Sequence, residues 1–213
     1  KTSVKEIAQH HDIVASFMAR WNQTLPGCSG HIHESLYGLH GETVLHDGTK
    51  KDSMSDIFRM FLAGQIRCLP EILPMFAPTI NSYKRLVEGF WAPTRATWGV
   101  DNRTCAYRVL NPSPKSTRVE VRVPGSDSNP YLAVAASLAS GLYGIRHGLS
   151  LDQESIKGNG YQDRTATKLA SNLKEAALIF QQSSIARELF GECFVEHFAA
   201  TRLWEWQQYQ QSI

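Results

Sequence analysis

The sequence lacks several features that mark common classes of protein. None of its 213 residues belongs to a run of 18 apolar residues, so no segment reads as a membrane-spanning helix. The formal net charge is only +2, which argues against a nucleic-acid-binding protein and against one held at an acidic membrane surface. Hydrophobic residues make up 42% and charged residues 20%, as in ordinary globular domains.

Cysteine is also scarce and scattered. The four cysteines have no CxxC spacing and are Cys28, Cys68, Cys105 and Cys193. This pattern argues against a zinc site and a disulfide scaffold, and it favours reduced thiols in a cytoplasmic protein. No signal-peptide pattern is visible. The chain begins inside a helical pattern and stops just after an aromatic one, so we expect both ends to be cut from a longer sequence.

Strict alternation over residues 117–123 predicts a strand. Val119, Val121 and Val123 fall on one face, and Arg118, Glu120 and Arg122 fall on the other. A second alternating segment covers residues 31–37 and places His31, His33 and Ser35 on one face. Apolar or β-rich runs predict further strands over residues 13–19, 94–98 and 105–110, with residues 99–103 as the turn between the last two.

Helical patterns occupy much of the remaining chain. A 3–4 spacing of apolar residues predicts a helix from Met54 to Leu69, with Ser53 and Asp56 as a capping box and Pro70 as its end. Asn129-Pro130 starts an alanine-rich helix that reaches Arg146 and that we expect to be buried. Helical stripes follow over residues 169–209. We therefore predict one α+β domain, with antiparallel strands up to Val123 and a helical half over one face of the sheet.

Basic residues are unusually frequent around the predicted strands. They outnumber the nearby acids and are Arg85, Arg103, Arg108, Lys115, Arg118 and Arg122. Two interpretations remain open from the residues alone. The set could form solvated ion pairs between strands, or it could surround a metal-bound polyanion, with Glu120 on a divalent cation. If the arginines converge, they repel one another unless an anion lies between them.

Five ordered segments carry a resemblance to a known family. They are residues 27–36 (GCSGHIHESL), 81–87 (NSYKRLV), 102–103 (NR), 118–122 (RVEVR) and 129–133 (NPYLA). With them, nearly the whole chain resembles the C-terminal part of the glutamine synthetase catalytic domain. The resemblance implies an α+β fold with the antiparallel sheet of that domain. It also implies a ligase that forms γ-glutamyl phosphate from ATP and glutamate and then lets an amine displace the phosphate.

The resemblance implies a role for each matching residue. His31 and Glu120 would hold one Mg²⁺ or Mn²⁺ ion, and the remaining residues would contact the substrates. Gly27 and Arg85 would bind glutamate, Arg103 and Arg108 would face the phosphates, and Arg122 would face the γ-carboxyl group. His33, Ser35, Lys115 and Arg118 would contact ATP. Because they share a period-2 phase with Ser35 and Arg118, we also expect His31, Glu120 and Arg122 to lie on adjacent antiparallel strands and to face one cavity.

Three positions depart from the family pattern. The family loop Gly-Tyr-Glu-Ala-Pro, whose glutamate helps to bind ammonium, reads Gly-Phe-Trp-Ala-Pro over residues 89–93. Pro26 replaces an asparagine before Gly27, and Arg20-Trp21 replaces a Lys-Pro pair of the nucleotide signature. Trp91 cannot supply a carboxylate to ammonium, so an organic amine is as suitable an acceptor as ammonia.

The resemblance extends to parts that the sequence does not contain. The family's N-terminal domain and its other metal-binding glutamates have no counterpart in residues 1–213, and subunits of the family form rings. We therefore expect a homo-oligomeric ring in the parent protein and no activity from this chain alone. The alternative is a catalytically inactive relative with a structural role.

Overall fold

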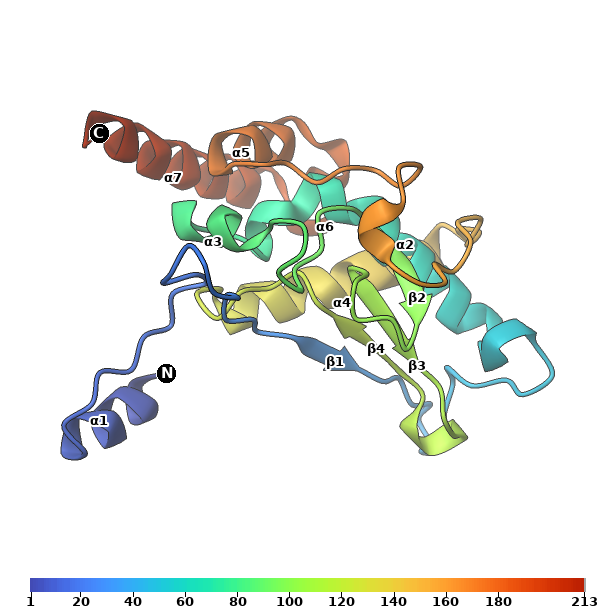
Figure 1. Cartoon of the computed structure of the whole chain (residues 1–213). Helices are drawn as coiled ribbons and strands as arrows, with labels where there is room; N and C mark the ends of the chain where they lie inside the picture. The colour runs from blue at the N-terminus through green and yellow to red at the C-terminus, as the bar shows by residue number, and fades with distance from the viewer. Residues whose placement is uncertain (213) are drawn as a thin grey trace.

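A four-stranded sheet lies at the centre of the chain, in a computed structural model that describes residues 1–212. The strands are β1 (Ile32–Glu34), β2 (Trp98–Val100), β3 (Tyr107–Leu110) and β4 (Arg118–Val121), in the order β1-β4-β3-β2. β4 pairs antiparallel with β1 and with β3. Figure 1 shows α2 and α4 over one face of this sheet, with α5 to α7 in a layer farther away. The predicted α+β class and helical half are confirmed.

One strand pair differs from the antiparallel expectation, because β2 runs parallel to β3. Residues 101–106 form a loop that returns to the starting edge instead of a tight hairpin turn. Asp101 begins this loop with a φ of +48°. The Asn102 side chain then fixes it by donating to the carbonyls of Ile156 and Gly158, at 3.0 and 2.8 Å.

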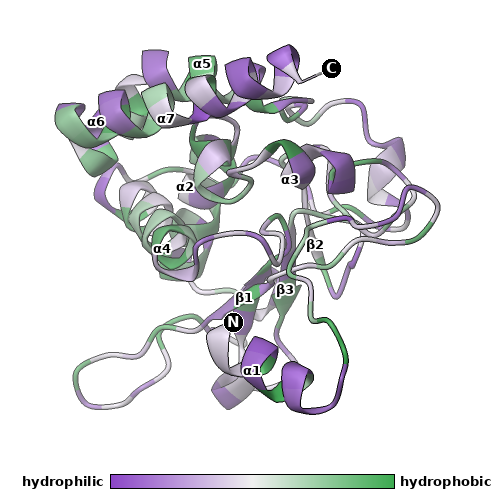
Figure 2. Ribbon diagram, turned by 90° about the vertical axis from the view of Figure 1, so that its left-hand side faces the viewer, coloured by the Kyte–Doolittle hydropathy of each residue, from purple (hydrophilic) through white to green (hydrophobic). Residues whose placement is uncertain are grey.

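Seven α-helices occur among residues 1–212. They are α1 (Thr2–His10), α2 (Asp56–Ile72), α3 (Ile80–Arg85), α4 (Pro130–Arg146), α5 (Leu173–Gln182), α6 (Ser184–Phe190) and α7 (Glu192–Gln211). α1 lies apart from the helical layers in both views, and most of its residues are hydrophilic in Figure 2. No helix in the described part of the chain is both long and apolar enough to cross a membrane.

The hydrophobic core joins the sheet to α2 and α4. It contains the valines of β4, Val119 and Val121, together with Phe58 and Phe61 of α2. The crossing of α2 and α4 depends on glycines that allow the two backbones to approach. A Cβ on Gly144 would lie 1.9 Å from the Met60 carbonyl oxygen, so any side chain there would separate the helices. The expected burial of α4 therefore holds for this face, whereas its other face is exposed.

The predicted boundaries of α2 were wrong at both ends. Ser55, and not Ser53, is the N-cap, and its hydroxyl accepts a hydrogen bond from the Phe58 N–H. Ser55 has the extended backbone that an N-cap requires, whereas Ser53 is left-handed with a φ of +50°. Pro70 lies inside the helix, which continues to Ile72.

The strand predicted over residues 13–19 was also wrong. This segment is extended but pairs with no strand in the described structure, and Val14 is 97% exposed. Its two ends are fixed, where the Ile13 N–H donates to the Ala8 carbonyl at 3.1 Å and the Ala19 carbonyl accepts from the Cys28 N–H at 2.7 Å. An apolar run predicts a strand only if the fold supplies an edge for it.

A buried carboxyl group lies between the sheet and the helices. Glu34 of β1 accepts hydrogen bonds from Gln65 Nε2 at 2.6 Å and from Ser137 Oγ at 2.8 Å. Its other oxygen, Oε1, is buried and has no hydrogen-bond partner among residues 1–212. Burial raises the pKa of Glu34 above its usual value, against the effect of these two hydrogen bonds.

Replacement of this carboxyl group should stabilise the protein at neutral and alkaline pH. Because the pKa of Glu34 is raised in the folded state, stability falls as pH rises above the ordinary glutamate value. Glu34→Gln should therefore increase the free energy of unfolding at pH 8 by about 1 kcal/mol and have less effect at pH 5. Urea titrations at the two pH values measure this, with exposed Glu6→Gln as the control. Equal destabilisation at both values would contradict it.

Candidate active site

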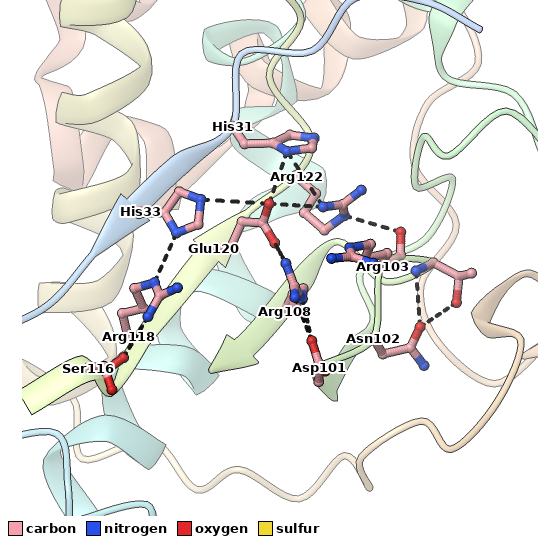
Figure 3. A network of polar contacts seen from close by, with 11 residues as sticks. His31, His33, Asp101, Asn102, Arg103, Arg108, Ser116, Arg118, Glu120 and Arg122 are labelled. Carbon is pink, nitrogen blue, oxygen red and sulfur yellow. Dashed lines mark hydrogen bonds and ion pairs between the residues drawn. The ribbon is translucent and has the colours of Figure 1, made fainter. Parts of the chain in front are cut away.

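The Glu120 carboxylate is the centre of a polar cluster on the sheet (Figure 3). Its Oε1 accepts from Arg122 Nη1 at 2.9 Å and lies 3.0 Å from His31 Nδ1, and its Oε2 accepts from Arg108 Nη1 at 3.0 Å. Glu120 is 4% exposed. Burial raises the pKa of Glu120, but the hydrogen bond from Arg108 and the charge of Arg122 outweigh it and hold the pKa below its usual range.

The register of the sheet creates this convergence. Glu120 pairs with His33 of β1 on one side and with Arg108 of β3 on the other. His33 Nε2 lies 3.7 Å from Glu120 Oε1, and Arg118 Nε donates to His33 Nδ1 at 3.2 Å. His31, just before β1, and Arg122, just after β4, complete the cluster. The expected juxtaposition of His31, Glu120 and Arg122 on adjacent antiparallel segments is present, and their functional roles stay predictions.

His31 has the properties of a neutral imidazole with a free nitrogen. Burial and the charge of Arg122 together lower its pKa to about 4, against the opposing effect of the Glu120 carboxylate. His31 Nε2 is buried without a hydrogen-bond partner in the described structure. A neutral imidazole with one unused nitrogen is suited to a metal ion.

The fit to a metal ion is nevertheless partial. No group of three His, Cys, Asp or Glu side chains that could hold a metal occurs within residues 1–212. Both oxygens of Glu120 are already bonded to guanidinium groups. Glu120 could join His31 on Mg²⁺ or Mn²⁺ only if Arg108 and Arg122 turned to other anions, such as phosphate oxygens. The remaining ligands would have to come from outside the described residues.

Arg85 and Gly27 lie together at one end of the cluster. Arg85, 3% exposed, donates from Nη1 to the Val123 carbonyl at 2.8 Å and from Nη2 to the Arg122 carbonyl at 3.0 Å. Burial lowers its pKa to about 10, so it is charged at neutral pH. A Cβ on Gly27 would lie 2.9 Å from Arg85 Cγ. The two residues expected to bind glutamate are therefore neighbours, and Arg85 keeps further N–H groups for a ligand.

The other end of the cluster leads to the residues expected to contact ATP. Arg118 Nη1 donates to the Ser116 carbonyl at 2.8 Å, in the short 3₁₀ helix Pro114–Ser116 that also carries Lys115. Lys115 and Ser35 are exposed, and neither side chain makes a hydrogen bond or ion pair among residues 1–212. The structure therefore does not bring Lys115 and Ser35 into contact with the Glu120 cluster.

Arg103 differs from the other arginines because its guanidinium group is free. It is exposed, and within the described chain no carboxylate or carbonyl binds its side chain. Its own carbonyl accepts from Arg122 Nε at 3.1 Å, which fixes its backbone beside the cluster. Arg108, by contrast, bridges two carboxylates, because it also pairs with Asp101 at 2.5 Å. Arg103 is thus the arginine best placed to take up an incoming anion.

The family model for the glutamine synthetase catalytic domain matches residues 1–213. The chain belongs to the glutamine synthetase family. It is 49% identical to type-1 glutamine synthetase 2 of Dictyostelium discoideum, over 100% of this chain and 42% of that protein. It is 42% identical to a glutamate–isopropylamine ligase of a Pseudomonas species, over 98% of this chain and 46% of that protein.

A solved structure agrees with this assignment. A GmaS/ADP complex superposes with a TM-score of 0.89 at 29% identity and covers 100% of this chain and 50% of that one. The chain therefore spans about half the length of the relatives it matches. The predicted family and fold are confirmed, and the relatives are ligases that form carbon–nitrogen bonds.

The segment over residues 89–93, called the flap below, contains Trp91, one of the three departures described above. Trp91 is 58% exposed and has a φ of +60°, a conformation that is uncommon for a bulky residue. Trp91 and Arg103 border the same cavity, of about 450 Å³, together with Asn102 and Ile156. The indole thus lies beside the one arginine that is free to bind an anion in the described site.

Sequence reasoning did not single out two further polar residues, Asp101 and Tyr161. Asp101 pairs with Arg108, and a lone carboxylate next to Asn102-Arg103 was the available signal. Tyr161 lies in the loop after α4, within the 3₁₀ turn Gly160–Gln162. Burial raises the pKa of Tyr161 while the charges of Arg122 and Arg85 oppose that rise, and its hydroxyl is buried without a hydrogen-bond partner among residues 1–212. A single aromatic residue in a polar loop was the available signal.

A polyphosphate should stabilise this chain by binding Arg103. A ligand at 100 times its Kd stabilises a protein by about 2.7 kcal/mol, which raises the Tm of a domain of this size by about 5 °C or more. Differential scanning fluorimetry with tripolyphosphate measures the shift. Arg103→Gln should remove at least half of it, whereas Arg146→Gln, exposed at the end of α4, should leave it unchanged. A full shift in Arg103→Gln would contradict this role.

Proposed function

We propose that the protein carrying this chain is an ATP-dependent glutamate–amine ligase. The observation that supports it most directly is the Glu120 carboxylate enclosed by Arg108, Arg122 and His31. Such a site binds anions through fixed cations, which is what phosphoryl transfer requires more than acid–base groups. Family membership and the named activities of the relatives support the same class of reaction.

The proposed reaction has two steps. A γ-carboxylate oxygen of glutamate attacks the terminal phosphorus of ATP, the bond to the bridging oxygen breaks, and ADP leaves. The amine nitrogen then attacks the acyl carbon of γ-glutamyl phosphate, the bond from this carbon to the bridging oxygen breaks, inorganic phosphate leaves with that oxygen, and the nitrogen loses a proton. Arg103 and Arg108 would stabilise the transferred phosphoryl group, and Arg122 the γ-carboxyl group.

The remaining groups have positioning roles in this proposal. Gly27 and Arg85 would hold glutamate at one end of the cluster, and His33, Ser35, Lys115 and Arg118 would hold ATP at the other. His31 and Glu120 would share a Mg²⁺ or Mn²⁺ ion, which supplies positive charge to the phosphate oxygens when bound. We infer from family membership that the protein works as a homo-oligomeric ring in the cytoplasm.

For the acceptor, we propose an organic amine in preference to ammonia. Trp91 stands where the family places a carboxylate, and two unit charges 4 Å apart near a surface interact by about 4 kcal/mol. An ammonium ion would forgo that attraction. An alkyl amine can bury carbon against the indole, at about 25 cal/mol per Å². The cavity beside Trp91 and Arg103 offers room for a substituent. The isopropylamine ligase among the relatives supports this choice.

Loss of the central carboxylate should abolish turnover. Glu120→Gln keeps the size of the side chain but removes the charge that orients Arg108 and Arg122, so glutamate-dependent ADP release should fall at least about a hundred-fold. A coupled ADP assay of the natural protein that carries this sequence measures it, with exposed Glu42→Gln as the control. If the unmodified protein releases no ADP with glutamate and any amine, the structural alternative replaces the ligase.

The acceptor is tested by a panel of amines. Phosphate release from the natural protein is measured with glutamate, ATP and either ammonium, isopropylamine or ethanolamine. An organic amine should give the highest kcat/KM. Trp91→Glu should shift the preference toward ammonium by at least about ten-fold, as expected for 1.4 kcal/mol or more of restored attraction.

The matched control is Trp204→Glu on α7, since Trp204 is also exposed but lies outside the flap. It should leave the preference unchanged. If ammonium is the best acceptor of the unmodified protein and Trp91→Glu does not improve it, the flap tryptophan is a packing residue and ammonia is the acceptor.

A further inference from the structure

A third buried arginine, Arg20, lies outside the Glu120 cluster, in addition to Arg85 and Arg122. It is 8% exposed, and its guanidinium group donates three hydrogen bonds to backbone carbonyls: Nε to Asn22 at 3.1 Å, Nη1 to Lys84 at 2.9 Å and Nη2 to Gln23 at 2.5 Å. The guanidinium carbon also lies 4.1 Å from the ring centroid of Phe90, in the flap. One side chain therefore connects residues 20–23, the end of α3 and the flap.

The backbone of Arg20 is fixed to the same helix. Its N–H donates to Asn81 Oδ1 at 2.9 Å, and its carbonyl accepts from Asn81 Nδ2 at 2.8 Å. Asn81 is in the first turn of α3, whereas Lys84 is in the last. The Nη1 group of Arg20 thus satisfies one of the carbonyls that a helix leaves unpaired at its C-terminal end, where a cation is favoured.

These contacts converge on the residues expected to bind glutamate. α3 ends at Arg85, directly after the Lys84 carbonyl that Arg20 holds. On the other side, a Cβ on Gly27 would lie 2.3 Å from the carbonyl oxygen of Ala19, the residue before Arg20. Residues 19 and 20 therefore touch both Gly27 and the helix that carries Arg85, and Arg20 alone extends this contact to the flap.

The stacking on Phe90 matters because its two neighbours in the flap, Gly89 and Trp91, are exposed, whereas Ala92 and Pro93 at the other end are buried. The flap contains Gly89 and Trp91 at positive φ. Glu88, at its base, pairs with Arg164, but both side chains are largely exposed, and such pairs contribute little. A cation over an aromatic ring contributes more when it is desolvated, as Arg20 is at 8% exposure. A lysine has no planar group to stack on Phe90. Its three donors are on one nitrogen, so they could not reach the same three carbonyls.

We propose that Arg20 is a positioning residue that couples the flap to the Gly27–Arg85 pocket. It is hydrogen-bonded to the end of α3 and stacked on Phe90 of the flap. A change in the mobility of either segment therefore changes the mobility of the other. It then governs the binding of glutamate and of the amine, and not that of ATP, although it stands in the family's nucleotide signature. The identity of these ligands rests on the proposed function, whereas the coupling of flap and helix does not.

Hydrogen–deuterium exchange of this chain tests the coupling without any substrate. Arg20→Met should accelerate amide exchange at least ten-fold in residues 83–92, which include the end of α3 and the flap. Phe90→Leu removes only the stacking, so it should accelerate exchange in the flap and, through Arg20, to a smaller extent at the end of α3. Arg146→Gln is the control for loss of a remote guanidinium group. Unchanged amide exchange of the flap in both Arg20→Met and Phe90→Leu would overturn the proposal. If Arg20→Met does not fold, the exchange of Phe90→Leu is the deciding measurement.

Steady-state kinetics of the natural protein then separate a positioning role from a structural one. Arg20→Met should raise the KM for glutamate and for the amine at least five-fold and change the KM for ATP less than two-fold. Arg20→Lys, which keeps the charge, should recover less than half of the loss. An equal rise in the KM for ATP would overturn the proposal in favour of a nucleotide contact. If no amine is ligated, the proposed function fails, and the exchange data still decide the role of Arg20.

Discussion

The site depends on one carboxylate that keeps several cations together. Without Glu120, the groups that surround it would repel one another, since two unit charges 4 Å apart near a surface interact by about 4 kcal/mol. Arg108 and Arg122 each bind one of its oxygens, and His31 stays neutral beside them because it is buried next to Arg122. The donors are therefore already oriented before an anion arrives. A polyanion would find Arg103 free and could then draw the other arginines from the carboxylate without a large movement of the backbone.

The parts of this arrangement that depend on local pattern were predictable from the sequence. Alternation placed Glu120 and Arg122 on one face, and the register of β1 with β4 then required His31 and His33 to meet them. Asn129-Pro130 marked the start of α4 because the asparagine side chain caps the first turn. The alternation and the helix cap are each set within a few residues, so a single sequence contains the information for them.

The features that were not predictable depend on distant partners. The direction of β2 is set by a loop that Asn102 fastens to residues 156 and 158, more than 50 residues away. The apolar run over residues 13–19 has the composition of a strand but no neighbouring edge to pair with. The replacement of the family's Lys-Pro pair by Arg20-Trp21 was visible in the sequence. The role of Arg20, however, depends on its contacts with Lys84 and Phe90, which only the fold brings near.

The loop after α4 has a consequence for anyone who alters this protein. Residues 153–160 are polar and without regular structure, so they resemble the kind of site where a tag, an insertion or a protease cut is tolerated. In the fold they are bound along their whole length. Trp98 Nε1 donates to the Gln153 carbonyl at 2.8 Å, the Ile156 N–H to the Trp98 carbonyl at 2.9 Å, and the Gly160 N–H to Thr104 Oγ1 at 2.7 Å. A cut or an insertion there would release the turn that carries Arg103, so this loop is a poor place for labelling or circular permutation.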